Sequence, residues 1–365
     1  MSQEVRGLVR FQDPQKPLVT LLCVCYNHAK YVEKALDSGL ALDYPNLQLI
    51  ITDDCSTDNS QQVIQNWIDR NEVNCIFLAH QQNMGLCATV NEALPLVSGK
   101  YLQPIPGDDF QYPEKLKKHM AVLEADEEVA LVCGNYCTVN EHGEIMEPRF
   151  FEENYQFPEN TFKAILTGHA NKGVVVHSPT VLIRFSALMQ YVGRYPEDIL
   201  QEDFFAWLNI SAKAKVAYVP EVLTAYRVLS TSLSQTLLSG PKRIIYLQDH
   251  LKVLDRLKPN LNKEQLEMVT RDEIKRYLKL GTTLNKQKQA VSPENFKSEL
   301  NRIHEKLIEL LTAKGSKEQR QKFARLLVRS AQNGVPLVAT TKPYLKYLPL
   351  STRIKYFLNL KLGSS

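Results

Sequence analysis

Two adjacent aspartates, Asp53 and Asp54, end a mostly apolar segment and are followed by small polar residues. Like charges side by side destabilise a fold unless something compensates them, and a hydrogen-bonded ligand or a cation would do so. The alternative is that Asp54, Ser56 or Asp58 only accepts hydrogen bonds from the free N–H groups that begin the next helix. Because capping explains one acid better than two, the pair indicates a ligand site.

A second pair of adjacent acids, Glu202 and Asp203, lies further along the chain. Neighbouring carboxyl groups raise each other's pKa, which would help the proton-accepting role that the family resemblance given below implies. The pair could equally occupy the first turn of a helix, where acids complement the helix dipole. The two interpretations are compatible.

The elements that must position these acids alternate between strand and helix. Apolar, β-rich runs predict strands at Pro17–Asn27, Leu47–Thr52, Asn74–His80 and Gly99–Ile105, and helical spacing of apolar residues predicts helices between them. Near-continuous apolar strands indicate a parallel sheet covered on both faces. Right-handed crossovers place the loops that follow such strands at one edge of the sheet, where ligands bind in open α/β folds. Asp53 and Asp54 are therefore expected at that edge.

Four stretches within residues 17–235 resemble, in order and spacing, the sequence blocks of family-two glycosyltransferases of the A-type fold. The first ends in Tyr-Asn, a helix and an Asp-Asp-x-Ser-x-Asp loop, and the second carries Asn-x-Gly, Gly-Lys-Tyr and an acidic loop before Pro-Glu-Lys-Leu. The third contains Glu-Asp followed by Trp-Leu, and the fourth contains Tyr-Arg. In order, they are Cys23–Ser60, Asn83–Leu116, Ser178–Ile210 and Val219–Ser234.

The resemblance implies an α/β fold with a Rossmann-like, mostly parallel sheet of the glycosyltransferase A type, followed by a C-terminal helical region. It also implies an inverting transfer of a sugar from a nucleotide-sugar, with a UDP-sugar expected, to a saccharide or lipid-linked acceptor in surface polysaccharide synthesis. The alternative within the same fold is a catalytically silent nucleotide-sugar-binding or scaffold protein. A nucleotidyltransferase would need a glycine-rich basic loop after the first strand, which "CYNHAKY" does not provide.

The resemblance also assigns roles to residues of this chain. Asp203 falls on the catalytic base, with Glu202 as its neighbour. Asp108 falls where a Mg²⁺ or Mn²⁺ ligand belongs, because hard cations prefer carboxylate and phosphate oxygens and offset the charge of a leaving diphosphate. Arg227 could face that diphosphate or form an ordinary salt bridge. The implied nucleotide-sugar-binding residues are Tyr26, Asn27, Asp53, Asp54, Asn83, Gly85, Asp109 and Arg227.

Two positions depart from the family's pattern. Pro106 stands where the first acid of an Asp-x-Asp triplet is common, although Gly107 after it permits a close backbone approach. Leu229 stands where many members carry a histidine that can join the metal. His169 and His177 are conceivable substitutes, but a lone histidine is more often structural. The sequence therefore predicts a metal site with few protein ligands.

Composition and charge exclude several other classes. The net charge of +4 is too small for a nucleic-acid-binding surface, and seven cysteines without a paired zinc spacing indicate reduced thiols. The N-terminus shows no secretory signal, and apolar runs do not reach the roughly 18 residues that span a bilayer. We expect a cytoplasmic protein, with contact to the inner membrane face as a further possibility.

The chain is expected to divide into three parts: a catalytic domain over residues 1–239, a helical bundle over residues 240–341, and a basic, aromatic tail over residues 342–365. Basic residues interleaved with Tyr, Phe and Leu suit a helix on an anionic membrane surface. The tail could instead pack on the bundle or mediate a homodimer. Pro349 argues against one continuous helix, and Ser292–Glu294 is typical of a helix start.

Overall fold

The structure is a computed structural model that describes residues 5–168, 175–232, 236–237, 242–290, 292–335, 339–349 and 352. The chain divides into two compact units, Met1–Ser230 and Thr231–Ser365. Each unit has a hydrophobic core of its own.

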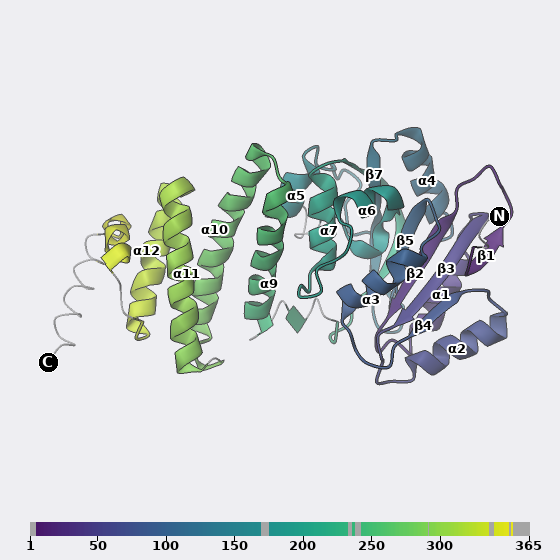
Figure 1. The fold of residues 1–365 in the computed structure, drawn as a ribbon, viewed down its shortest axis with the longest axis horizontal. Coiled ribbons are helices and arrows are strands. Elements are labelled where there is room, and N and C mark those ends of the chain that lie inside the picture. Colours follow the sequence, from purple (N-terminus) through teal and green to yellow (C-terminus); the bar gives the residue numbers. More distant parts are fainter. Residues whose placement is uncertain are drawn as a thin grey trace. The chain divides into compact units, whose positions relative to one another are not determined.

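The first unit is an α/β domain built around a ten-stranded sheet (Figure 1). Its strands are β1 (Leu8–Phe11), β2 (Val19–Cys25), β3 (Asn46–Asp53), β4 (Ile76–Ala79), β5 (Tyr101–Pro106), β6 (Phe110–Gln111), β7 (Val129–Val139), β8 (Ile145–Glu147), β9 (Leu182–Arg184) and β10 (Lys215–Arg227). Its helices are α1 (Val32–Leu40), α2 (Ser60–Asn71), α3 (Leu86–Ala93), α4 (Lys115–Ala125), α5 (Thr161–Thr167), α6 (Phe185–Tyr191) and α7 (Glu202–Ser211), with short 3₁₀ turns η1 (Leu94–Leu96) and η3 (Ser178–Thr180).

The predicted alternation of strands and helices is confirmed, since β2, α1, β3, α2, β4, α3 and β5 follow one another. These four strands pair in parallel in the order β4-β3-β2-β5. Beyond β5 the sheet is mixed, because β9 runs antiparallel to both β5 and β7. A three-residue strand is too short to show a recognisable hydrophobic alternation, so the sequence did not predict it.

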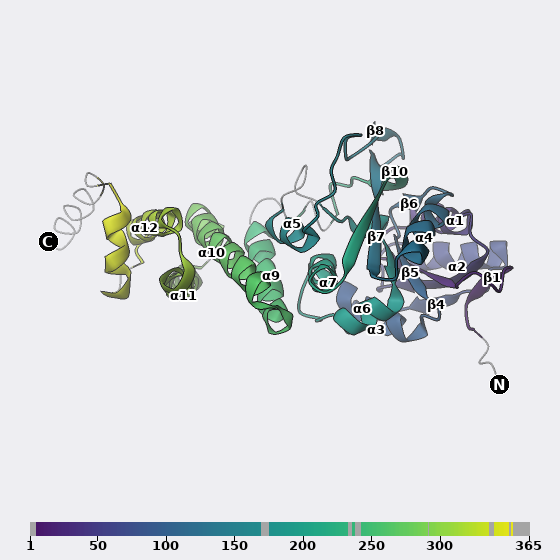
Figure 2. The same ribbon diagram turned by 90° about the horizontal axis from the view of Figure 1, so that it is seen from above.

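Alternate side chains of β2 and β3 build the core that fixes the sheet. Helices α1 and α2 contribute to the same cluster, so the amphipathic pattern of each helix is buried against the strands. The residues of this cluster from the four elements are Val19, Leu21, Cys23, Cys25, Leu47, Leu49, Ile51, Val32, Ala35, Leu36, Ile64 and Trp67. This packing holds the carboxyl ends of β2 and β3 at one edge. Figure 2 shows α7 beside β10 and α6 in the second half of the domain.

The second unit is helical, as predicted. It contains α9 (Lys242–Leu257), η4 (Lys258–Asn260), α10 (Lys263–Lys286), η5 (Lys288–Ala290), α11 (Pro293–Lys314), α12 (Lys317–Gln332) and η6 (Ala339–Tyr347). The predicted helix start at Ser292 is confirmed, because its side chain accepts a hydrogen bond from the N–H of Asn295. In the described part of the chain, none of the helices combines the length and the apolar character that crossing a membrane requires.

The first residues of the expected C-terminal tail belong to this helical unit. Tyr344, Leu345 and Leu348 are buried, and the Tyr344 ring lies 5.0 Å from that of Phe323 on α12. The Tyr344 hydroxyl also lies 3.1 Å from Thr312 Oγ1 on α11. The basic positions after residue 352 lie outside the described residues, so membrane contact and dimerisation through that part stay predictions.

Candidate active site

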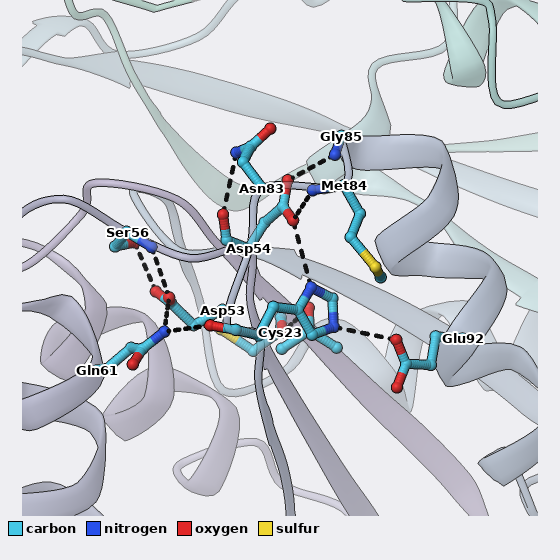
Figure 3. Close-up of polar contacts among 11 residues, drawn as sticks. Cys23, Asp53, Asp54, Ser56, Gln61, Asn83, Met84, Gly85 and Glu92 are labelled. Carbon is cyan, nitrogen blue, oxygen red and sulfur yellow. Dashed lines mark hydrogen bonds and ion pairs between the residues drawn. The ribbon is translucent and has the colours of Figure 1, made fainter.

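Asp53 ends β3 with a carboxylate that its own loop neutralises. Its Oδ1 accepts hydrogen bonds from the Ser56 N–H at 2.8 Å and from Gln61 Nε2 at 2.9 Å, and its Oδ2 accepts one from Ser56 Oγ at 2.6 Å (Figure 3). The residue has no exposed surface. Asp53 therefore shapes the turn between β3 and α2, and its charge is compensated inside the protein.

Asp54 anchors the loop that leads into α3. Its carboxylate accepts hydrogen bonds from the backbone N–H groups of Met84 at 2.7 Å and Gly85 at 2.8 Å, and its carbonyl accepts one from Asn83 Nδ2 at 3.0 Å (Figure 3). Gly85 has φ of +83°, a conformation that favours glycine, and it directly precedes the first residue of α3. A carboxylate there also complements the dipole of the helix. Asp54 thus ties the Asn-x-Gly loop to the end of β3.

His80 lies between two carboxylates beside this anchor. Its Nδ1 is 3.2 Å from Asp54 Oδ1 and its Nε2 is 3.2 Å from Glu92 Oε2 on α3. The ring is nearly buried, with 7% of its side chain exposed. His80 therefore adds a second connection between the end of β3 and α3.

The loop after β2 is tied to the loop after β3 through Asn27. Asn27 has φ of 60°, which asparagine tolerates better than most residues, and its Oδ1 accepts a hydrogen bond from the Thr57 N–H at 2.7 Å. Its own N–H donates to Ser56 Oγ at 2.8 Å. Tyr26 beside it is 44% exposed. The Tyr26 side chain is thus exposed to solvent at the sheet edge.

The acidic loop after β5 presents one of its two aspartates outward. Asp109 is 2% exposed and accepts a hydrogen bond from the Arg227 N–H at 2.8 Å, and burial, together with the adjacent Asp108, raises its pKa well above the usual range. The Asp108 side chain is 14% exposed and lies 3.7 Å from His28 Nε2. Asp108 is therefore the acid of this pair with access to a ligand.

Arg227 is held by backbone carbonyl groups. Its Nε donates to the Asp108 carbonyl at 2.8 Å, and its Nη1 donates to the carbonyls of Asn140 at 2.8 Å and Glu141 at 3.0 Å. The guanidinium also lies over the Tyr31 ring, 4.6 Å from its centre. Arg227 is 3% exposed, and these contacts tie the end of β10 to the acidic loop. They differ from the surface salt bridge considered as the alternative.

Glu202 and Asp203 occupy the first turn of α7, as the sequence suggested. Asp203 Oδ1 accepts a hydrogen bond from the Phe204 N–H at 2.6 Å. Burial raises the pKa of Asp203, and the hydrogen bond from Phe204 opposes that rise. Burial also raises the pKa of Tyr195 above its usual range, and Glu202, Cys87 and Asp203 add to that shift. The acid pair is therefore near enough to this buried tyrosine to raise its pKa.

Helix α3 connects the region of Asp203 to the loop held by Asp54. Asn91 on α3 donates from Nδ2 to the Tyr195 carbonyl and accepts at Oδ1 from the Tyr195 N–H, both at 2.8 Å. Cys87, one turn earlier, donates to the Ile199 carbonyl at 3.4 Å. The chain that leads into α7 is thus fastened to the same helix whose first turn Asp54 anchors.

The paired aspartates and the acidic loop meet at one edge of the sheet. Strand β2 lies between β3 and β5, its Cys25 carbonyl accepts from the Asp54 N–H at 3.0 Å, and its Val24 carbonyl accepts from the Gly107 N–H at 2.9 Å. Burial raises the pKa of Cys23 above its usual range, with contributions from Asp108 and Asp53. The carboxyl ends of the three parallel strands therefore bring these acids together.

The described residues offer few protein ligands for a metal ion. Among them, His, Cys, Asp and Glu side chains do not gather in any group of three or more that could hold one. The His177 ring stacks on Tyr136 at 4.6 Å and meets the edge of Tyr226 at 4.4 Å, and burial lowers its pKa to about 4. These contacts are typical of a structural histidine. His169, the other possible substitute, lies outside the described residues.

Sequence reasoning missed two side chains of this region. His28 directly follows Asn27, so its place on the loop after β2 could have been recognised, but its proximity to Asp108 could not. Asn91 lies one helical turn after Cys87, and no local sequence pattern indicates that its partner is Tyr195. Both contacts join segments that are far apart along the chain.

The sequence model of the family described as Glycosyl transferase family 2 matches residues 20–192. The putative teichuronic acid biosynthesis glycosyltransferase TuaG of Bacillus subtilis is 25% identical over 245 residues, which cover 67% of this chain and 92% of TuaG. The uncharacterized glycosyltransferase RP339 of Rickettsia prowazekii is 23% identical over 71% of this chain and 77% of its own length.

Among solved structures, residues 1–349 of S. aureus TarS superpose with a TM-score of 0.59 at 16% identity, over 91% of this chain and 93% of that one. At this identity the likeness concerns the fold alone, and it supports the α/β domain followed by helices. The matched family segment contains the β2–β5 half of the sheet with Asp53, Asp54 and Asp108. Residues 20–192 therefore carry a segment similar to glycosyltransferase family 2, and the chain is a glycosyltransferase.

Proposed function

We propose that this glycosyltransferase moves a sugar from a nucleotide-sugar, with a UDP-sugar as the expected donor, to a hydroxyl group of a saccharide or lipid-linked acceptor, with inversion at the anomeric carbon. One observation carries the proposal. Helix α3 is anchored at its first turn to Asp54 and at its second half to the segment that leads to Asp203. A donor site and a base are therefore attached to one rigid element.

The nucleotide would lie at the carboxyl ends of β2, β3 and β5. Tyr26 has an exposed ring that can stack on a base, and Asn27, Asn83 and Gly85 border the same edge. A carboxylate can accept about four hydrogen bonds, so Asp54 would meet the base through acceptor sites that its loop bonds leave open, and Asp53, which has no exposed surface, would support it from behind. S. aureus TarS has been solved with UDP-GlcNAc, at a TM-score of 0.53 to this chain, which supports a UDP-sugar as the first donor to test.

A Mg²⁺ or Mn²⁺ ion would be held by Asp108 and by the diphosphate itself. Among the described residues, Asp108 supplies a partly exposed carboxylate, the kind of oxygen ligand that suits a hard cation, and the diphosphate would supply the other oxygens. When bound, the ion would offset the charge that builds up on the leaving diphosphate. Asp109, buried behind Asp108, would support the loop. A mannosyltransferase of Pyrobaculum calidifontis, with a TM-score of 0.51, has been solved with GDP-Man and Mn²⁺.

Asp203 would act as the general base. As the acceptor oxygen forms its bond to the anomeric carbon, the bond from that carbon to the diphosphate breaks, and the hydroxyl proton passes to the Asp203 carboxylate. Attack from the face opposite the leaving group inverts the anomeric centre. Burial of Asp203 favours this role, because the raised pKa strengthens the carboxylate as a base. The negative charge of Glu202 would help to raise the pKa of Asp203.

The acceptor would be a growing surface saccharide or a lipid-linked one. The name of TuaG, a putative enzyme of teichuronic acid biosynthesis, supports a cell-surface polymer as the acceptor class. The basic and aromatic positions of the tail after residue 352 would then bring the enzyme to the inner membrane face or join two copies in a homodimer. A cytoplasmic location follows from these two proposals. Binding of nucleic acid has no role in this function.

A thermal-shift panel with UDP-, GDP-, CMP- and dTDP-sugars, with and without Mn²⁺, tests the donor, because a bound ligand stabilises the folded state in proportion to its affinity. Turnover of the stabilising donor then tests the enzyme, with Asp203→Asn expected to bind the donor and to lose transfer. If wild type binds a donor but neither transfers nor hydrolyses it, the catalytically silent alternative is supported. If none of the four donors stabilises the chain, the proposed function fails.

A further inference from the structure

His28 lies opposite the outward-facing acid of the β5 loop without bonding to it. Its Nε2 is 3.7 Å from Asp108 Oδ2, which is longer than a hydrogen bond. Both side chains are partly exposed, His28 by 23% and Asp108 by 14%. The two side chains therefore lie side by side at the sheet edge, and both are partly open to solvent.

The position of His28 is fixed by its own loop and by Gly107. The His28 N–H donates to Ser60 Oγ at 2.9 Å, and the next N–H, that of Ala29, donates to Asp58 Oδ2 at 3.1 Å. A Cβ at position 107 would come within 2.9 Å of His28 Nδ1. Gly107 thus lets the imidazole ring lie against the backbone of the acidic loop, and the ring has little room to turn away.

The surroundings of the ring select one tautomer. His28 Nδ1 is buried and finds no hydrogen-bond partner among the described residues, so a proton there would be an unsatisfied buried donor. We therefore assign the proton of the neutral ring to Nε2, the nitrogen that faces Asp108. The Nε2–H group is then a partly exposed donor that makes no hydrogen bond to the described residues, since Asp108 Oδ2 is 3.7 Å away.

We propose that His28 Nε2–H donates a hydrogen bond to a diphosphate oxygen of the nucleotide-sugar, across from the cation held by Asp108. The inference rests on the proposed function, since it assigns the diphosphate to this edge of the sheet. It places a hydrogen-bond donor for an anion beside the partly exposed carboxylate of Asp108. It also explains how a site with few metal ligands retains a diphosphate, because charge-assisted hydrogen bonds are strong.

The test compares ligands that differ only in phosphate content. Titration calorimetry with UDP, UMP and uridine is run on wild type, His28→Ala and His28→Gln, each with and without Mn²⁺. His28→Ala is expected to weaken UDP binding by about tenfold or more, the change that follows loss of one hydrogen bond to a charged group. Uridine affinity should not change. His28→Gln, whose amide N–H can reach the position of Nε2, should recover most of the UDP affinity.

Several outcomes would overturn the inference. Equal UDP affinity in wild type and His28→Ala would contradict the inference about His28 and would leave the proposed function intact. An equal loss of UDP and uridine affinity would show that His28 only supports the loop. Loss confined to titrations with Mn²⁺ would make His28 a metal ligand instead of a diphosphate donor. If wild type binds none of the three ligands, as well as failing the donor panel, the inference falls together with the proposed function.

Discussion

The side-chain amide of Asn91 makes two hydrogen bonds, each of 2.8 Å, to the backbone of Tyr195, which lies 104 residues later in the chain. This pair fastens α3 to the segment that leads into α7, where Asp203 lies. Asp54 holds the other end of α3 through the N–H groups of Met84 and Gly85. The geometry makes Asn91 a positioning residue between the loop held by Asp54 and the segment that leads to Asp203.

Asn91→Ala is therefore expected to lower kcat more than it lowers donor affinity. Loss of two buried hydrogen bonds should reduce the free energy of unfolding by about 2–3 kcal/mol, because the Tyr195 N–H and carbonyl lose their partners. UDP titration should give a nearly unchanged Kd, while kcat falls at least tenfold. Asn66→Ala, at an exposed position on α2, is the control. An equal loss of kcat and affinity would contradict a positioning role.

The sequence was sufficient to predict the strand–helix alternation around these residues. Strands β2, β3 and β5 are long, apolar and bounded by polar residues, so their ends, and with them Asp53, Asp54 and Asp108, could be placed at one edge. The partners of those acids could not be predicted. Asp54 accepts hydrogen bonds from N–H groups about 30 residues further along the chain, on the far side of β4 in the sequence. No local sequence pattern indicates which N–H groups will reach it.

Arg227 is a hydrogen-bond donor whose acceptors, likewise, could not be predicted from the sequence. Its Tyr-Arg motif suggested a charge that faces a ligand, because guanidinium groups suit phosphate oxygens. The carbonyls of Asp108, Asn140 and Glu141 come from loops 119, 87 and 86 residues away and accept from its Nε and Nη1. Sequence identifies which side chains can donate, whereas their acceptors are set by the tertiary fold.

Arg227→Lys separates a structural role from a phosphate-binding role. Lysine keeps the charge but cannot reproduce the fork that donates to the Asp108 and Asn140 carbonyls. We expect a loss of about 2–4 kcal/mol in the free energy of unfolding, because buried carbonyl groups lose charged donors. Arg149→Lys, at a partly exposed arginine whose Nη1 donates to the Pro220 carbonyl, is the matched control. Unchanged stability with weakened UDP binding would instead favour a diphosphate contact.

Asp203→Asn is expected to lower the rate of transfer by about 10²–10⁴-fold, because the acceptor hydroxyl loses its base. In wild type, the rate should fall as pH drops through the raised pKa of Asp203, since protonation removes the base. Stability should change in the opposite direction, because the folded state binds this proton more tightly than the unfolded state. The free energy of unfolding contributed by Asp203 therefore decreases as pH rises from the ordinary aspartate range through the raised pKa.

Donor titration and pH–rate profiles of wild type and Asp203→Asn check this prediction, with Glu127→Gln as an exposed control. Retained donor affinity together with lost transfer supports the base assignment. A pH–rate profile without an acidic limb, or a variant that transfers at the wild-type rate, would remove Asp203 from the mechanism.

His304 makes the helical unit sensitive to acid. Its ring is buried, its Nε2 lies 3.2 Å from Ser330 Oγ, and burial lowers its pKa from 6.5 to about 4. Ser330 is bonded in turn to Asn285 Nδ2 at 3.1 Å, so the ring belongs to a buried polar network between α10, α11 and α12. Protonation would place an uncompensated charge in that network.

Between pH 6.5 and 4 the unfolded state binds a proton at His304 that the folded state does not, so the free energy of unfolding decreases as pH falls through this window. The expected loss is about 3 kcal/mol, from a pKa difference of roughly 2.5. Urea unfolding followed by the helical circular dichroism signal measures it at several pH values. His304→Gln keeps a hydrogen-bonding group without a titrating ring, so its unfolding free energy should depend less on pH than that of wild type. Identical pH dependence in the two proteins would assign the acid sensitivity to other groups.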